Sequence, residues 1–144
     1  MDDRELVDAA REAIENAYVP YSEYRVGAAL LAADETMFTG CNIENANYSN
    51  SLHAEEVAIA EAVKEGHHDF AAIAVSSGTR DGVTPCGMCR QTLAEFCNEE
   101  FPVYCDEGES DGGDGEEISE YTLSELLPNT ISLDTLEAAE DNRQ

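Results

Sequence analysis

His53-Ala54-Glu55 and Pro85-Cys86-Gly87-Met88-Cys89 are the two stretches from which the fold and the chemistry of this chain are inferred. Two cysteines separated by two residues in the first turn of a helix can both point at one metal ion, and the helix N-terminus favours the thiolate form that zinc requires. His53 as a third protein ligand leaves one tetrahedral position for water, which is typical of a catalytic zinc site. We therefore predict a Zn²⁺ ion held by His53, Cys86 and Cys89.

Glu55 follows the histidine by two residues, and in the first turn of a helix its carboxylate can reach a water on the metal without binding the metal. Zinc lowers the pKa of such a water to roughly 7. A carboxylate there can take the proton and deliver it to a ring nitrogen and then to a leaving amine. The combined pattern H-x-E…P-C-x-x-C is the signature of zinc nucleobase deaminases. Taken alone, His53 and Glu55 would be the start of a solvated helix, and the cysteine pair would be ambiguous between zinc and redox use.

A structural zinc module is the main alternative from another class of protein. It requires a fourth cysteine or histidine ligand, for which the candidates are Cys41, Cys97, Cys105, His67 and His68. We interpret Cys97 and Cys105 as small core residues because they lie on apolar faces, and His67 and His68 as loop residues because they follow a helix-ending glycine. The role of Cys41 stays open.

Charge sets limits on the partners of the chain. Thirty-two acidic residues against seven basic ones leave a formal net charge of −25. Such a surface repels polyanions, so we expect no nucleic-acid partner. The acidic residues are spread through the sequence, which favours adaptation of a folded surface to high salt, where self-repulsion is screened. An ordinary acidic protein is the alternative.

Length and composition predict one zinc-dependent domain over residues 1–136 and an acidic, frayed tail over 137–144. No apolar stretch approaches the roughly 18 residues of a membrane span, and the acidic N-terminus lacks the basic and apolar regions of a signal peptide. We therefore expect a cytoplasmic protein without a membrane partner. Five cysteines are an odd number, which argues against a disulfide framework.

Hydrophobic periodicity predicts an α/β protein. Four helices are expected near residues 6–17, 51–65, 86–97 and 124–127, and five strands near 25–32, 36–43, 70–75, 102–105 and 117–122, with a Gly/Asp/Glu-rich loop over 106–116. The order of these elements mixes a hairpin with strand–helix crossovers. It implies a three-layer α/β/α fold in which helices cover both faces of a mixed sheet of about five strands.

The chain resembles the short, zinc-dependent cytidine deaminases from Tyr18-Val19-Pro20-Tyr21-Ser22 to Leu126-Leu127-Pro128. The element that separates free-nucleoside enzymes from their relatives is Gly40-Cys41-Asn42-Ile43-Glu44-Asn45-Ala46-Asn47-Tyr48. The resemblance implies that Asn42 and Glu44 hold the ribose and that Ala54 and Tyr24 also contact the substrate. An amide and a carboxylate suit neutral hydroxyls, whereas a phosphate would suit Arg or Lys.

The same resemblance implies hydrolytic deamination of cytidine or deoxycytidine in pyrimidine salvage, and a homotetramer. Three departures from the family pattern involve four positions. His53 replaces a cysteine of many short members, and Glu56 then stands where an arginine offsets the extra thiolate charge. Tyr24 replaces a phenylalanine, and Ile131 replaces a phenylalanine that reaches a neighbouring subunit's pyrimidine.

The Arg90-Gln91 pair also matches this branch of the family, and we expect Arg90 to have a structural role. Two other functions stay open at this stage. One is deamination of a nucleotide or nucleic acid, and the other is a zinc-stabilised binding module without catalysis. The choice between cytidine and deoxycytidine depends on the shape of the pocket.

Overall fold

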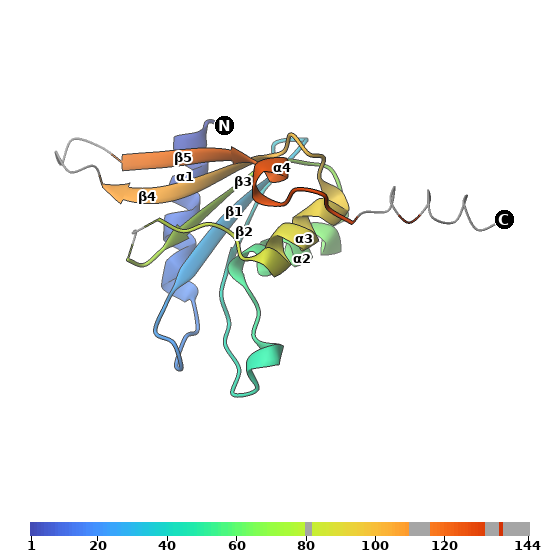
Figure 1. Cartoon of the computed structure of the whole chain (residues 1–144). Coiled ribbons are helices and arrows are strands. Elements are labelled where there is room, and N and C mark those ends of the chain that lie inside the picture. Colours follow the sequence, from blue (N-terminus) through green and yellow to red (C-terminus); the bar gives the residue numbers. More distant parts are fainter. Residues whose placement is uncertain (80–81, 110–115, 132–135, 137–144) are drawn as a thin grey trace.

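Two apolar strands, β1 (Val26–Ala32) and β3 (Phe70–Ser77), pair antiparallel at the centre of the sheet. Nearly every residue of both strands is buried, because helices cover the two faces of the sheet. The computed structural model describes residues 1–79, 82–109, 116–131 and 136, and Figure 1 shows the arrangement. The 137–144 tail of the sequence prediction lies outside the described residues.

The sheet has five strands in the order β2-β1-β3-β4-β5. Strand β2 (Met37–Cys41) pairs antiparallel with β1, whereas β4 (Pro102–Glu109) runs parallel to β3. Strand β5 (Glu116–Thr122) closes the other edge, antiparallel to β4. The predicted mixed sheet of about five strands is confirmed.

Successive side chains of β1 point to opposite faces of the sheet, so the hydrophobic core has two parts. Ala28 and Leu30 face the layer of α2 (Ala54–Lys64) and α3 (Gly87–Phe96), and Ala29 and Leu31 face α1 (Asp3–Ala13). Figure 1 shows α1 on one face of the sheet and α2 and α3 on the other. The three-layer α/β/α fold is therefore observed. The zinc motifs share the face opposite α1.

Two parts of the element prediction were wrong. The first helix ends at Ala13 and continues as a 3-10 turn over Ile14–Asn16. The segment predicted as a loop from residue 106 instead continues β4 to Glu109, with a register shift between Asp106 and Gly108. Composition suggested a loop there, but pairing with β5 and burial of the Asp106 side chain keep the chain extended. Local propensity for strands is easily overridden by such tertiary pairing.

The segment between β2 and α2, teal in Figure 1, extends beyond the sheet and includes a 3-10 turn over Tyr48–Asn50. Ile43 attaches this segment to the rest of the molecule through an isolated bridge to Tyr18, and a second bridge, from Ile43 to Leu52, joins the two ends of the segment. A short helix, α4 (Leu123–Leu126), follows β5. Within the described residues no helix is both long and apolar enough to cross a membrane.

Candidate active site

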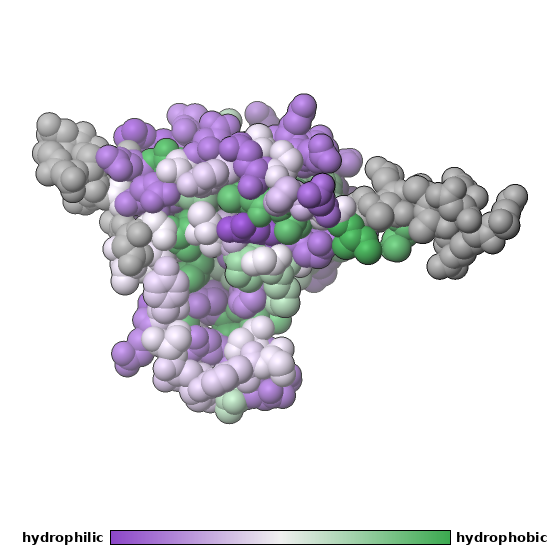
Figure 2. All heavy atoms as spheres, in the orientation of Figure 1, coloured by the Kyte–Doolittle hydropathy of each residue, from purple (hydrophilic) through white to green (hydrophobic). Residues whose placement is uncertain are grey.

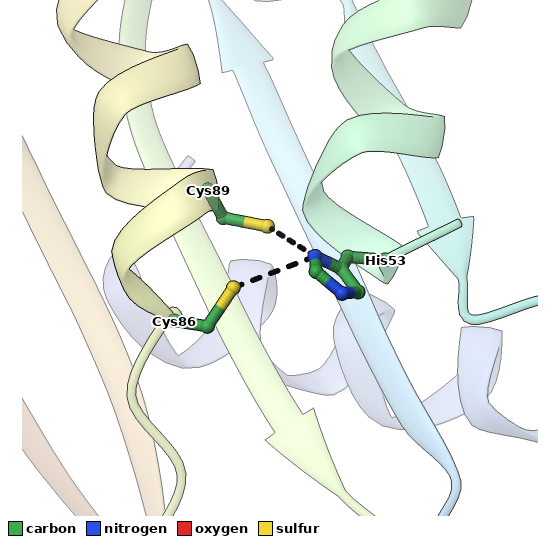
Figure 3. Close-up of side chains that lie close together, drawn as sticks. All are labelled: His53, Cys86 and Cys89. Atoms are coloured by element: carbon green, nitrogen blue, oxygen red, sulfur yellow. Dashed lines mark hydrogen bonds between the residues drawn. The ribbon is translucent and has the colours of Figure 1, made fainter. Parts of the chain in front are cut away.

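His53 and Cys86 are the N-cap residues of α2 and α3, and both have extended backbone conformations. Cys89 lies in the first turn of α3, so three side chains from two helix N-termini converge (Figure 3). The Nδ1 atom of His53 lies 3.2 Å from the sulfur of Cys89 and 3.4 Å from that of Cys86. These are the three ligands that the sequence predicted, and the structure brings them together.

The donor set fits a zinc ion. Zn–S bonds of about 2.3 Å and Zn–N bonds of about 2.0–2.1 Å at tetrahedral angles place nitrogen and sulfur about 3.5 Å apart. The observed nitrogen–sulfur distances lie within a few tenths of an ångström of this value. Burial raises the pKa of the Cys89 thiol, and the nearby Glu55 raises it further. A zinc ion held by these residues would offset both effects, because a cation stabilises the thiolate.

Within the described part of the chain, the group able to hold a metal has three members. The five candidates for a fourth ligand lie elsewhere. Cys97 and Cys105 are packed in the core, where burial raises both thiol pKa values to about 12. His67 packs against Phe38 with ring centroids 5.0 Å apart. Three protein ligands leave a coordination position for a reactant, as catalytic rather than structural sites do.

Glu55 belongs to the first turn of α2 and is only 5% exposed. Burial raises the pKa of its carboxyl group above the ordinary value, although a hydrogen bond with Cys89 and the charge of His53 oppose the shift. A carboxyl group with a raised pKa can accept and return a proton near neutral pH. Glu55 thus lies where acid–base chemistry beside the metal ligands requires a carboxyl group.

Glu56 occupies the position where the resemblance predicts an arginine. Its Oε1 atom accepts the backbone N–H of His53 at 3.2 Å and lies 3.0 Å from Nδ1 of the same residue. The carboxylate is therefore a capping partner for the first turn of α2. A neutral histidine ligand is compatible with this negative neighbour, since the site carries one thiolate fewer than a three-cysteine site.

A cleft of about 360 Å³ opens beside the ligand group. Its described lining consists of Tyr24, Val26, Asn42, His53, Ala54, Glu55, Gly82, Val83, Thr84 and Cys86. Eight residues had been predicted as zinc, catalytic or substrate groups, and six of them line this cleft: Tyr24, Asn42, His53, Ala54, Glu55 and Cys86. Cys89 is fully buried, and Glu44 lies outside the described lining. A larger groove of about 690 Å³ lies between the end of α3 and α4 and contains none of these groups.

Asn42 joins the cleft to the first residues of β1. Its side-chain oxygen accepts the backbone N–H of Val26 at 2.9 Å, and its amide nitrogen donates to the carbonyl of Tyr24 at 2.8 Å. These two bonds orient the amide at the edge of the cleft. An amide oxygen has a second lone pair and an NH₂ group a second hydrogen, so each can still bond to a ligand.

Glu44 does not belong to the described lining of the cleft. Its carboxylate accepts the backbone N–H groups of Tyr21 and Ser22, both at 3.0 Å, and the hydroxyl of Ser22. These hydrogen bonds hold the pKa of Glu44 below its ordinary value, and the bond from the Ser22 hydroxyl has the largest effect. Glu44 is thus an ionised acceptor that organises the loop beside Tyr24.

Arg90 ties α3 to its surroundings. It donates to the carbonyls of Pro85 and Leu126, both at 2.7 Å, and to the hydroxyl of Thr84 at 3.3 Å. Its neighbour Gln91 donates to the carbonyl of Ile131 at 2.9 Å, and the Ile131 side chain is exposed. Arg90 therefore holds the end of α3 that carries the two cysteines.

Four lining residues received no role from the sequence: Val26, Gly82, Val83 and Thr84. Gly82, Val83 and Thr84 directly precede Pro85-Cys86 in the sequence, and this proximity to a metal-ligand motif could have indicated that they line the cleft. Gly82 has a φ of +89°, a conformation that side chains rarely adopt, and it lies against the Glu107 carboxylate. Val83 and Thr84 line the cleft together with His53 and Cys86.

A three-ligand metal group, a buried carboxylate and an adjoining cleft on an α/β/α scaffold define a metal-dependent hydrolytic enzyme. Comparison with known proteins gives the family. Residues 1–105 match the family model described as the cytidine and deoxycytidylate deaminase zinc-binding region. The chain belongs to this family, and its cofactor is zinc.

Relatives of similar length extend the match over nearly the whole chain. A cytidine deaminase of Sporosarcina psychrophila is 46% identical over 96% of this chain and 98% of its own length, and one of Halalkalibacterium halodurans is 43% identical over 94% and 98%. The crystal structure of cytidine deaminase from Burkholderia pseudomallei covers 91% of this chain and 100% of its own, with 37% identity and a TM-score of 0.80. The crystal structure of cytidine deaminase from Mycobacterium tuberculosis has 33% sequence identity and a TM-score of 0.78, and the match covers 92% of this chain and 99% of that one.

Proposed function

We propose that this enzyme deaminates cytidine and deoxycytidine hydrolytically, giving uridine or deoxyuridine and ammonia, and that it serves pyrimidine salvage. The observation that carries the proposal is the position of Glu55, which is buried beside His53, Cys86 and Cys89 and lines the cleft. The names of the relatives support the choice of substrate.

In the proposed reaction, water adds to C4 of the pyrimidine and the bond between C4 and the amine breaks. Zinc, when bound, acts as a Lewis acid that makes water a usable nucleophile near neutral pH. Glu55 accepts a proton from the attacking water and transfers it to N3 of the ring. A second transfer through Glu55 moves the proton of the new C4 hydroxyl to the amine, so that the C4–O double bond forms as the C4–N bond breaks and ammonia leaves.

Substrate recognition is assigned to four residues. Asn42 binds a ribose hydroxyl from the edge of the cleft, and Ala54 and Tyr24 contact the base and the sugar. Glu44, ionised and held by Tyr21 and Ser22, provides a second acceptor for the ribose. The described lining of the cleft contains neither lysine nor arginine, which supports a neutral nucleoside over a phosphorylated one.

The test follows the ultraviolet change of cytidine, deoxycytidine and CMP incubated with purified protein in molar salt, with and without a zinc chelator. We expect loss of both nucleosides, no loss of CMP, and no activity after chelation. Activity on CMP alone would contradict the sugar assignment and favour the nucleotide. Inactivity on all three would favour a zinc module without catalysis.

We also propose a homotetramer. Large apolar and aromatic side chains are exposed on Tyr18, Tyr21, Tyr48 and Leu52. Exposed groups of this kind mark interaction surfaces. Sedimentation velocity in low and molar salt tests this assignment. Because each chain carries a formal charge of −25, we expect assembly to require high salt.

A cytoplasmic location and a single domain over residues 1–136 complete the proposal. None of the five cysteines, all of which the structure describes, forms a disulfide, as expected in a reducing compartment. The strongly acidic composition supports the absence of a nucleic-acid partner and adaptation to high salt. Limited proteolysis that removes the last residues without loss of activity would support the domain boundary, and cleavage into two stable halves would contradict it.

A further inference from the structure

Gly40 of β2 marks a point where α2 lies exceptionally close to the sheet. A Cβ atom at position 40 would lie 2.2 Å from the carbonyl oxygen of Ala54 and 2.6 Å from the amide nitrogen of Ala58. Non-bonded contacts between carbon and a carbonyl oxygen lie at about 3.3 Å or more. A side chain on residue 40 therefore requires the first turn of α2 to move by roughly 1 Å, since the opposing atoms belong to backbone.

This contact is adjacent to the chemistry. Ala54 lies between the metal ligand His53 and the buried carboxyl Glu55, so its carbonyl moves with both of them. Cys86 and Cys89 belong to α3, which Arg90 anchors separately to Pro85 and Leu126. A displacement of α2 therefore changes the distance between the histidine and the two sulfurs, because α3 has its own attachment.

We propose that Gly40 is a positioning residue of the active site. The absence of its side chain sets the distance of α2 from β2 and thereby places His53 and Glu55 at the correct distance from Cys86 and Cys89. The φ angle of Gly40 is not in the left-handed region. Glycine is therefore needed at residue 40 because a side chain would not fit there, and not because the backbone conformation requires it. The inference rests on the proposed zinc-dependent deamination.

Gly27 of β1 provides a matched control. A Cβ atom there would lie 2.1 Å from the carbonyl oxygen of Ala10 and 2.9 Å from the amide nitrogen of Ile14. The close approach has the same form and a similar distance, but the opposing helix is α1, which lies on the other face of the sheet. None of the metal ligands or described cleft residues belongs to α1.

The experiment compares Gly40→Ala and Gly27→Ala with the wild-type enzyme at a temperature where circular dichroism shows all three folded. Zinc affinity is measured by competition with a chromophoric chelator, and the absorption of the Co²⁺-loaded protein reports ligand geometry. For Gly40→Ala we expect zinc affinity to fall by about 10–100-fold, kcat to fall by about 100-fold, and the cobalt spectrum to change. Gly27→Ala should lose a similar amount in Tm but keep zinc affinity and kcat within about twofold.

Equal zinc affinity and kcat in the two variants would overturn the inference. If Gly40→Ala does not fold, Ala58→Val displaces α2 more mildly at the same contact, and Ala62→Val is its control further along the helix; both alanines are fully buried. Ala58→Val must then lower zinc affinity more than Ala62→Val does. A wild-type enzyme that neither binds zinc nor deaminates cytidine would refute the proposed function itself, a result distinct from either comparison.

Discussion

Arg11 of α1 and Asp106 of β4 form a bidentate ion pair, with Nε 2.7 Å from Oδ2 and Nη2 2.7 Å from Oδ1. The Asp106 side chain is fully buried, and Arg11 is 9% exposed. The hydroxyl of Ser76 and the backbone N–H of Gly108 also donate to the same carboxylate, at 2.7 and 2.9 Å. The pair joins the α1 layer to the sheet on the face opposite the cleft.

Asp106→Asn should destabilise the protein without affecting catalysis. Removing one partner of a buried ion pair leaves the other charge uncompensated, which costs about 3–5 kcal/mol. Urea unfolding measures the change in the free energy of unfolding. The control is Glu65→Gln, which alters the exposed pair with Lys64 and should change stability by less than about 0.5 kcal/mol. Equal effects of the two substitutions would contradict the assignment, and we expect kcat to stay unchanged in both.

The same pair predicts how stability depends on pH. Burial opposes ionisation of Asp106, but the hydrogen bonds from Arg11 and Ser76 outweigh it, so its pKa lies below the ordinary value of 3.8. The folded state therefore binds this proton less readily than the unfolded state. The resulting stabilisation is present above pH 3.8 and is lost as the pH falls through the folded pKa. Urea unfolding between about pH 5 and about pH 2 should show a steeper loss in the wild type than in Asp106→Asn; parallel curves would be the contrary result.

Glu55→Gln should keep the zinc site and abolish turnover. The amide has nearly the same size but cannot exchange a proton, and general acid–base groups contribute about 10²–10⁴-fold to rate. Zinc content is measured by atomic absorption and kcat by the ultraviolet assay. Glu61→Gln, an exposed position of the same helix, is the control and should leave both unchanged. Near-normal turnover of Glu55→Gln would exclude the proton-transfer role.

Asn42→Ala and Glu44→Ala should raise KM more than they lower kcat. Each removes an acceptor assigned to the ribose, and a lost hydrogen bond to a polar or charged group is worth about 1–3 kcal/mol, or roughly 5–150-fold in KM. Asn50→Ala, on the exposed 3-10 turn of the same segment, is the control. If KM for cytidine is unchanged in Glu44→Ala, its role is confined to the hydrogen bonds with Tyr21 and Ser22.

Tm should rise as potassium chloride is increased from about 0.1 M to molar concentrations. Hydrophilic residues cover most of the face shown in Figure 2, and the chain has 32 acidic and seven basic residues. Salt shortens the Debye length from about 10 Å at 0.1 M to about 3 Å at 1 M and so screens repulsion among surface charges. Thermal unfolding followed by circular dichroism gives the measurement. A Tm independent of salt would contradict adaptation to high salt.

Spacing along the chain was sufficient to predict features that lie within a few residues of one another. The order of helices and strands followed from the hydrophobic period, and the residue types at His53, Cys86 and Cys89 followed from two short motifs. The meeting of the histidine with the two cysteines, 33 and 36 positions away, depends instead on the packing of α2 beside α3. Local chemistry determines these features, because a helix N-terminus presents neighbouring side chains in a nearly fixed geometry. The strand over residues 106–109 was missed because its composition favours a loop, whereas pairing with β5 and burial of the Asp106 side chain keep it extended.

The sequence by itself determined the family and the two short motifs that contain His53, Glu55, Cys86 and Cys89, since each motif depends on residue type and short spacing. Three contacts were decided by the tertiary structure alone. Arg11 pairs with Asp106, 95 positions away, and the Glu44 carboxylate accepts hydrogen bonds from the Tyr21–Ser22 loop. The backbone of α2 lies close to Gly40, where a side chain would not fit. The physical reason is that such contacts depend on strand order and on the distance between layers. Both are properties of the packed chain as a whole, and no local pattern of residues specifies them.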